Sequence, residues 1–241
     1  MSAMGTAMTL SGAAPRTDLR SPLLEGLTPR DLDSILAAAT QRHFLANTVV
    51  SSQGDPASSL YLLTSGRARY FFVTPEGRRI LLRWLVPGDV FGGMAILSRP
   101  AFYLVGTELL KDSHVFAWDR AVIRGLAVQH PKLMDNALSI AADYIQWDLD
   151  LHATLNGGSA RQRLAAILLG LARDIGHKVP GGLEIEVTNE DLAAAASLTL
   201  FTVSRLLSAW QRKGAVAKTR GKVLLRFSEG AAPPTPTELL C

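Results

Sequence analysis

Cysteine is almost missing from this chain: among 241 residues there is one, Cys241, at the last position. A single cysteine excludes an intrachain disulfide framework, a cysteine-bound iron–sulfur cluster and a zinc site built from several thiolates. Long apolar runs are missing too, because no stretch reaches the ~18 uninterrupted apolar residues of a membrane span. Residues 1–15 are rich in small side chains and lack a basic segment followed by an apolar one, so we interpret them as a tail and not a signal peptide. We therefore expect a cytoplasmic protein with no membrane partner.

The signatures of catalysis are also lacking. We find no phosphate-binding glycine-rich loop, no spacing of metal ligands and no recognisable pairing of a nucleophile with a base. The pair Gly92-Gly93 is better explained as a tight turn between strands. We therefore do not expect an enzyme.

Positive charge is present, and it is concentrated in one part of the chain. The net charge is +4, but residues 159–228 contain eleven lysines and arginines against five acidic residues. That segment therefore carries +6 and leaves −2 for the rest of the protein. A basic C-terminal third indicates a polyanionic partner for that third, such as nucleic acid.

The N-terminal half is predicted to begin with helices and to continue with β-strands. Residues 22–45 predict short helices, with Thr28 as an N-cap and Pro29 in the first turn. Between Val49 and Trp118, short β-rich runs alternate with Gly, Pro and Asp turns at intervals of about ten residues, which is typical of a β-sandwich or roll.

A long helix is predicted to follow. Asp119 is placed to cap a short helix, and Pro131 to open a long one. Apolar positions then recur in steps of three and four, as on the seam of a two-stranded coiled coil. The seam comprises Met134, Leu138, Ala141, Ile145, Leu149, His152 and Leu155. Gly157, Gly158 and Ser159 then interrupt the helix before residues 161–175 renew it, which predicts a hinge.

The remaining segment has the order of a winged helix-turn-helix: a helix, a short β pair, two short helices and a hairpin turning at Arg220-Gly221. Thr188 is the expected N-cap of the first short helix. The second, over residues 200–213, has a buried stripe of Val203, Leu206, Leu207 and Trp210. Its other side is a candidate for reading the major groove, and the hairpin for holding phosphates. The candidate DNA-binding residues are Thr199, Leu200, Phe201, Thr202, Ser204 and Arg205 from the helix and Lys218, Arg220 and Lys222 from the hairpin.

Several stretches in this order resemble the Crp–Fnr family of bacterial transcription regulators, over about residues 22–227. They are Gly54 to Gly66, Gly77-Arg-Arg-Ile-Leu-Leu, Pro87-Gly-Asp-Val-Phe-Gly92, Thr188-Asn-Glu-Asp-Leu-Ala and Thr202-Val-Ser-Arg-Leu-Leu207. The resemblance implies an α+β protein with an N-terminal antiparallel β-roll, a long central dimerisation helix and a C-terminal winged helix-turn-helix. It further implies a homodimer on a near-palindromic site, two recognition helices about 34 Å apart in successive major grooves, and RNA polymerase as a partner.

The sensor departs from the branch of the family that binds cyclic AMP. In that branch a Phe-Gly-Glu motif binds the ribose and an Arg-Ser pair binds the cyclic phosphate, whereas this chain has Phe91-Gly92-Gly93 and, at the second place, Tyr103-Leu104. Asp148-Leu149 stands where that branch reads adenine from the long helix. A buried phosphate without a cationic partner is unfavourable, so we do not expect cyclic AMP to bind.

The effector is therefore left open. The pocket would comprise Phe91, Gly92, Gly93, Met94, Tyr103, Leu104 and Asp148. Its apolar members suit either an apolar effector or a filled core. A haem would need axial ligands, for which the candidates are His43, His114, His130, His152 and Met94. We expect His43 and His130 near helix ends, His114 at a strand start, and His152 on the seam, where it could bind a ligand or set the dimer register.

The recognition helix also departs from the family. Where members often carry an acidic residue for cytosine, this chain has Phe201, which suits a thymine methyl, while Arg205 keeps its place for guanine. The predicted domains are a tail (1–20), the roll (21–130), the dimerisation helix and hinge (131–158), the DNA-binding domain (159–228) and a second tail (229–241). The alternative function is a ligand-binding β-roll module that controls a protein partner.

Overall fold

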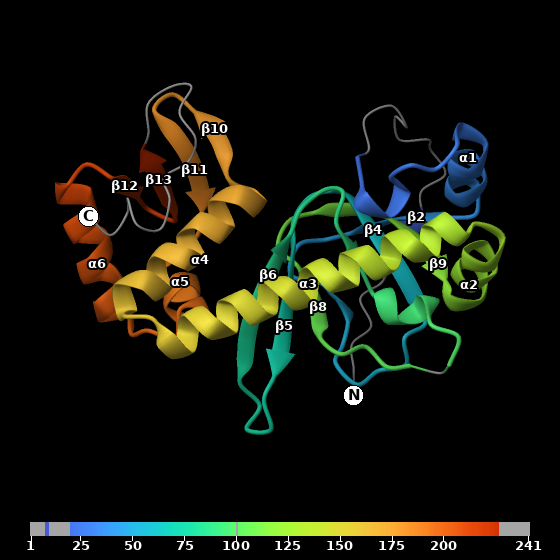
Figure 1. The fold of residues 1–241 in the computed structure, drawn as a ribbon, viewed down its shortest axis with the longest axis horizontal. Coiled ribbons are helices and arrows are strands. Elements are labelled where there is room, and N and C mark those ends of the chain that lie inside the picture. Colours follow the sequence, from blue (N-terminus) through green and yellow to red (C-terminus); the bar gives the residue numbers. More distant parts are fainter. Residues whose placement is uncertain (1–7, 10–19, 100, 227–241) are drawn as a thin grey trace. The chain divides into compact units, whose positions relative to one another are not determined.

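The computed structural model describes residues 8–9, 20–99 and 101–226 (Figure 1). The two predicted tails therefore lie outside the described residues, except for Met8–Thr9 (β1) and Arg20. The chain divides into two compact units, residues 1–144 and 145–241. This division falls within the long helix α3 (Pro131–Gly157), because the first part of that helix packs on the N-terminal core.

The first unit contains two antiparallel sheets that form the predicted β-roll. One has the strand order β1-β2-β9-β4-β7 and the other β3-β8-β5-β6. The first comprises β1, β2 (Thr40–Phe44), β9 (Ser113–Asp119), β4 (Ser59–Ser65) and β7 (Val90–Phe91). The second comprises β3 (Val49–Ser51), β8 (Gly106–Leu109), β5 (Ala68–Val73) and β6 (Arg79–Leu85). Buried side chains of both sheets form one apolar cluster, including Leu63, Leu85 and Phe91. The roll is thus closed by apolar packing between its sheets.

Helices cover a second apolar cluster of the same unit. They are η2 (Pro22–Leu24), α1 (Pro29–Ala37), η3 (Gly93–Ile96), α2 (Arg120–Gln129) and the first part of α3. Thr28 caps α1 as predicted, since its hydroxyl accepts the Asp31 N–H at 3.2 Å, and Pro29 is the first helical residue. Asn136 of α3 donates to the carbonyls of Leu23 and Glu25, which fixes α3 on the N-terminal segment.

Two local predictions are wrong. Residues 40–44 form strand β2, not a helix, because they pair with β9 in register from Thr40↔Ala117 to Phe44↔Ser113. That pairing is a tertiary interaction that overrides weak local preference. Asp119 occupies the N-cap position of α2, but its carboxylate makes no capping hydrogen bond. It accepts instead from the Ser59 hydroxyl at 3.2 Å and lies 3.8 Å from Arg42.

The second unit is the predicted winged helix-turn-helix. Its elements are α4 (Ala160–Ile175), β10 (His177–Val179), β11 (Gly182–Glu186), α5 (Asn189–Ala195), α6 (Leu200–Arg212), β12 (Val216–Thr219) and β13 (Lys222–Arg226). The strands form one antiparallel sheet in the order β10-β11-β13-β12. In the described part of the chain no single helix has the length and apolarity of a membrane span; by these two measures alone the bent pair α5 and α6 would pass.

Candidate nucleic-acid interface and effector region

The turn between α5 and α6 sets where the recognition helix begins. Thr188 caps α5 through a capping box with Asp191. Ser197 in the turn adopts a positive φ of 51°, which ends α5 sharply. Thr199 then caps α6: its hydroxyl accepts the Thr202 N–H at 3.2 Å and lies 2.9 Å from the Thr202 hydroxyl. Both threonines therefore hold the start of α6, whose free N–H groups suit a phosphate.

One face of α6 is buried and the other is open. Val203, Leu206, Leu207 and Trp210 are buried, as the sequence predicts. On the open side Arg205 is exposed, and Thr202 and Ser204 are half-buried. The first turn also exposes two apolar side chains, Leu200 at 49% and Phe201 at 76%.

The hairpin β12–β13 forms the wing. It turns at Arg220-Gly221, where Gly221 has a φ of 74°, and Arg220 is exposed while Lys218 is half-buried. Lys222 differs from these two because its Nζ lies 2.6 Å from a Glu184 oxygen and 4.0 Å from Glu186. The hydrogen bond to Glu184 raises the pKa of Lys222 above its ordinary value. Lys222 therefore has a partner within the wing sheet, which sequence spacing did not reveal.

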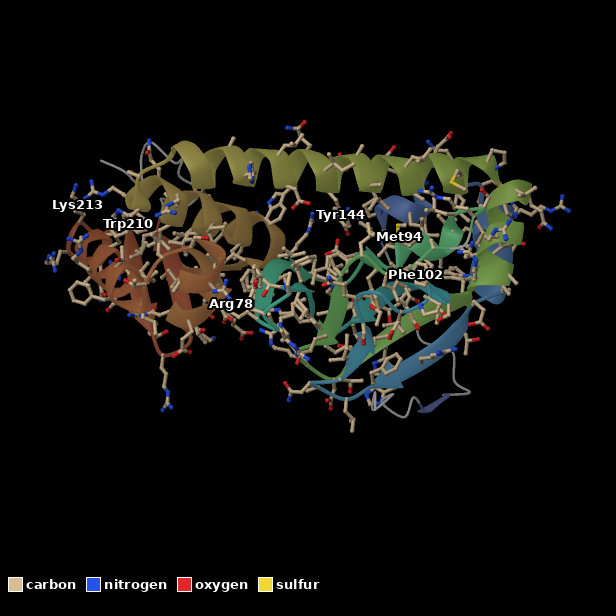
Figure 2. All side chains as sticks on the ribbon, turned by 90° about the horizontal axis from the view of Figure 1, so that it is seen from below. Arg78, Met94, Phe102, Tyr144, Trp210 and Lys213 are labelled. Atoms are coloured by element: carbon tan, nitrogen blue, oxygen red, sulfur yellow. The ribbon has the colours of Figure 1, made fainter. Side chains whose placement is uncertain are left out.

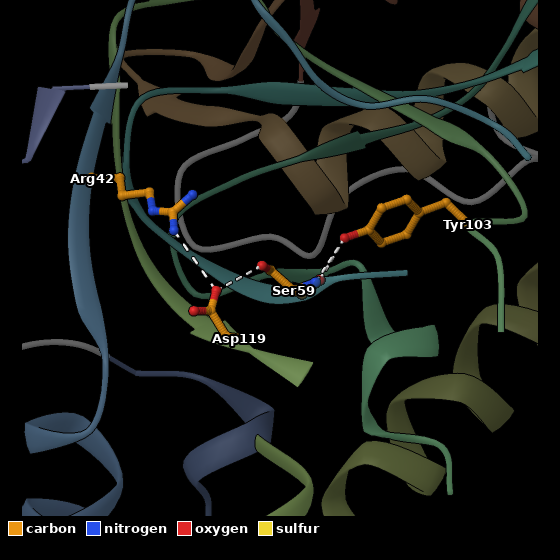
Figure 3. A network of polar contacts seen from close by, with 4 residues as sticks. All are labelled: Arg42, Ser59, Tyr103 and Asp119. Carbon is orange, nitrogen blue, oxygen red and sulfur yellow. Dashed lines mark hydrogen bonds and ion pairs between the residues drawn. The ribbon is translucent and has the colours of Figure 1, made fainter. Parts of the chain in front are cut away.

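Tyr103 and Phe91, two residues of the candidate effector pocket, are buried within the roll. Phe91 is fully buried and stacks on Tyr61, with ring centres 4.8 Å apart. The Tyr103 hydroxyl donates to the Ser59 carbonyl at 2.9 Å and accepts the Ser59 N–H at 3.0 Å. Figure 3 shows this pair continuing to Asp119 and Arg42. Tyr103 thus has an internal structural role.

The other pocket residues differ in exposure. Position 92 requires a glycine, because its φ is 75° and a Cβ there would lie 2.5 Å from the Ser59 carbonyl oxygen. A Cβ on Gly93 would meet nothing within 4 Å. Met94 is half-buried against the helical core, Leu104 is 64% exposed, and Asp148 is exposed on α3 in the second unit. The structure therefore brings Phe91 and Tyr103 into the roll but leaves Leu104 outside it.

The segment after Gly93 is held by Arg120 at the start of α2. Its guanidinium donates to the carbonyls of Ala95 at 3.2 Å and Leu97 at 2.7 Å, and also to that of Arg99. These are charge-assisted hydrogen bonds, which are stronger than neutral ones. In the Crp–Fnr resemblance this segment follows the ribose-binding motif, and here a side chain of the roll itself fixes it.

A group of three residues that the sequence did not single out joins α3 to the roll. The hydroxyls of Tyr70 and Tyr144 both donate to the Val90 carbonyl, at 3.2 and 3.3 Å. The guanidinium of Arg83 lies 4.6 Å from the Tyr144 ring centre, and the two tyrosine rings meet edge to face. Figure 2 shows Tyr144 on α3 pointing toward the roll. Burial raises the pKa of Tyr70 well above its ordinary value. The helical spacing of Leu133, Ala137, Ile140 and Tyr144 is the sequence signal that could have indicated this inner face.

Two of the candidate histidines face each other. His43 is in β2, which corrects the expected helix end, and faces His114 of β9 with ring centres 4.7 Å apart. His130 is at the C-terminus of α2, as expected, 3.1 Å from Asp31. His152 is exposed on α3. Within the described ranges no three His, Cys, Asp or Glu side chains are grouped to hold a metal ion.

The predicted hinge coincides with the break between α3 and α4. Gly157 is the last residue of α3, and Ser159 is the N-cap of α4. Ser159 and Gln162 form a capping box, with the Ser159 N–H donating to the Gln162 side chain at 2.8 Å. Gly158 is therefore the one residue between the last residue of α3 and the N-cap of α4.

Comparison with known proteins agrees with this architecture. Residues 41–130 match the family model of the cyclic nucleotide-binding domain, and residues 162–228 match that of the Crp-like helix-turn-helix domain. The cyclic AMP receptor protein of Thermus thermophilus is 33% identical over 213 residues, covering 86% of this chain and 93% of the relative. The fumarate and nitrate reduction regulatory protein of Escherichia coli is 28% identical over 175 residues, covering 71% and 68%.

Solved structures show the same fold. The catabolite activator protein of Thermus thermophilus superposes with a TM-score of 0.51 at 30% identity, covering 86% of this chain and 94% of that one. FixK2 of Bradyrhizobium japonicum gives 0.68 at 24% identity, covering 78% and 93%, and supports the fold alone.

A roll of the cyclic nucleotide-binding type followed by a winged helix-turn-helix defines a DNA-binding regulator with an effector-binding type of domain. The chain belongs to the Crp–Fnr family of transcription regulators, with a helix-turn-helix DNA-binding domain and an effector-binding domain. Its relatives are regulators and not enzymes, and regulators of this family bind DNA and act as dimers.

Proposed function

We propose that the chain is a homodimeric regulator that reads a near-palindromic site through α6 and holds its backbone with the wing. The observation that carries the proposal is the open side of α6, where Arg205 is exposed opposite the buried stripe and the first turn is capped by Thr199. An exposed arginine on such a helix suits two hydrogen bonds to guanine O6 and N7. The proposed contacts are Thr199, Leu200, Phe201, Thr202, Ser204, Arg205, Lys218, Arg220 and Lys222. Lys222 would contact a phosphate only in competition with Glu184, its partner within the wing sheet.

A gel shift with the DNA upstream of the protein's own gene tests this proposal. Arg205→Ala removes the guanine contact and should weaken binding by about ten-fold or more, since a bidentate base contact contributes ~1–3 kcal/mol. Arg124→Ala is the matched control, because Arg124 is an exposed arginine on α2 of the roll. Equal binding by wild type and Arg205→Ala, or no binding by either, would contradict the proposal.

Dimerisation through α3 is supported by large apolar side chains of this helix that are exposed. Leu138, Ile145 and Leu149 are 59%, 61% and 59% exposed, at seam spacing along the helix. Ala141 and His152 on the same seam are also exposed, while Met134 packs on the roll core. The side chain of Leu155 is outside the described part. An exposed apolar seam of this kind is what a coiled-coil partner buries.

For control of DNA binding we propose two states. A signal in the roll would change the contacts of Tyr144 with Val90 and Arg83 and so the position of α3, and Gly157, Gly158 and Ser159 would reorient the DNA-binding domain. The domains would be the roll (21–130), the dimerisation helix with hinge (131–158) and the DNA-binding domain (159–228). The proposed effector is not cyclic AMP, because Gly93 and Tyr103 stand where its carboxylate and arginine partners would be. RNA polymerase is the proposed partner at the promoter and the cytoplasm the proposed location.

Hydrogen exchange across residues 150–165 with and without effector tests the hinge, and unchanged protection would count against it.

A further inference from the structure

The first turn of α6 exposes more apolar surface than a solvated helix start needs. Phe201 is 76% exposed and its neighbour Leu200 49%, although four other large apolar residues of α6 are buried. Exposing a phenylalanine to water is unfavourable, so its exposure indicates that something covers it when the protein acts. The inference below rests on the proposed function, because it names what covers this residue.

The rest of the open face argues for DNA as the occupant and against a protein. Thr202, Ser204 and Ser208 are hydroxyl residues, and Arg205 lies four positions after Phe201, on the same side of the helix. A protein-binding face of a helix repeats apolar anchors along its length. Here the exposed apolar residues are confined to the first turn, and an arginine follows one turn later. In the major groove the one apolar group on a base edge is the thymine C5-methyl.

The spacing of the two side chains fixes where that thymine should be. Four residues rise about 6 Å along an α-helix, and successive base pairs are about 3.4 Å apart. Phe201 therefore reaches a base pair about two steps from the guanine that Arg205 contacts.

We propose that Phe201 determines operator specificity by packing on a thymine methyl within about two base pairs of the Arg205 guanine in each half-site. Removing that methyl should weaken binding about four-fold per half-site, the effect of one buried methyl-sized group, and about fifteen-fold when both half-sites are changed. Phe201→Glu should replace the thymine preference by a cytosine preference, because a carboxylate accepts from cytosine N4.

The test starts by selecting binding sites for the full-length protein from random duplex DNA. Each thymine of the selected half-site is then replaced singly by deoxyuridine, which lacks only the methyl group, and affinity is measured by fluorescence anisotropy. Phe201→Ala should fold normally because its ring is largely exposed, and it should bind the thymine and uracil duplexes equally. Val128→Ala, an 82% exposed apolar residue of α2, is the matched control and should keep the full difference.

The outcomes separate this inference from the function on which it depends. Loss of affinity with one specific uracil in wild type, absent in Phe201→Ala, supports the inference. The inference would be overturned if no single uracil substitution changed the affinity of wild type for the selected site, or if Phe201→Ala showed the same loss with uracil as wild type. Either result would leave the DNA-binding proposal intact. If selection enriches no sequence at all, the proposed function fails and this inference with it.

Discussion

The hydroxyl of Tyr103 is bonded twice to a single residue, donating to the Ser59 carbonyl and accepting the Ser59 N–H. Ser59 is the first residue of β4, and its own hydroxyl donates to Asp119 at the end of β9. Tyr103 therefore fixes residues 101–105 to the roll, at the start of β4 and beside the end of β9. At this place the cyclic-AMP branch of the family has a ligand-binding residue, and here the side chain has a structural partner.

Tyr103→Phe tests that structural role. The variant leaves two buried backbone groups of Ser59 without the hydroxyl, so the free energy of unfolding should fall by about 1–3 kcal/mol. Urea denaturation of the full chain measures this change. Leu104→Ala, one residue on and 64% exposed, should change stability by less than about 0.5 kcal/mol. Equal stability of Tyr103→Phe and wild type would contradict the assignment.

The two adjacent glycines of the roll should respond oppositely to substitution. Gly92→Ala places a Cβ against the Ser59 carbonyl in a left-handed backbone, and should cost about 1–3 kcal/mol. Gly93→Glu projects into open space and should leave stability nearly unchanged. Urea denaturation of both variants provides the comparison.

The Gly93→Glu variant also tests whether the roll can bind cyclic AMP. Restoring the carboxylate alone should not create cyclic AMP binding in calorimetry, since Tyr103 still stands where the arginine would bind the phosphate. Tight binding of cyclic AMP to the wild-type protein would show that the sensor has been misinterpreted.

The wing lysines and arginine should differ in how they contribute to salt dependence. Lys218→Ala and Arg220→Ala should each lower the slope of log affinity against log salt by about one per subunit, because each removes a phosphate contact. Lys222→Ala should lower it less, since Lys222 already has Glu184 as a partner. Anisotropy titrations at several salt concentrations give the slopes. A Lys222→Ala effect as large as that of Arg220→Ala would mean that DNA replaces Glu184 completely.

The seam of α3 should control assembly. Ile145→Asp places a charge at a position that a coiled-coil partner would bury, so sedimentation should show a monomer with strongly reduced DNA affinity. Asp143→Asn, an exposed neighbour off the seam, is the control and should stay dimeric. A dimeric Ile145→Asp protein would place the interface elsewhere.

The sequence predicted the elements whose signals are local. Thr188 marks the start of α5 as a capping residue, the stripe from Val203 to Trp210 marks α6 by its periodicity, and the structure has both helices where expected. Strand β2 was not predicted, because its residues are mostly polar and form a strand only by pairing with β9. The partners of Asp119 and Lys222 are distant in sequence, so spacing could not reveal them. Tyr144 was not predicted, because it lies on the inner face of α3 that contacts Val90 and not on the outer seam that the apolar pattern marks.

The central claim, sequence-specific DNA reading through α6, is tested most directly by selection from random duplexes with wild type and Arg205→Ala in parallel. We expect wild type to enrich an inverted repeat whose half-sites lie one helical turn apart, about 34 Å, each with a guanine that Arg205→Ala no longer requires. Enrichment of no sequence, or of the same guanine-containing repeat by both proteins, would contradict it.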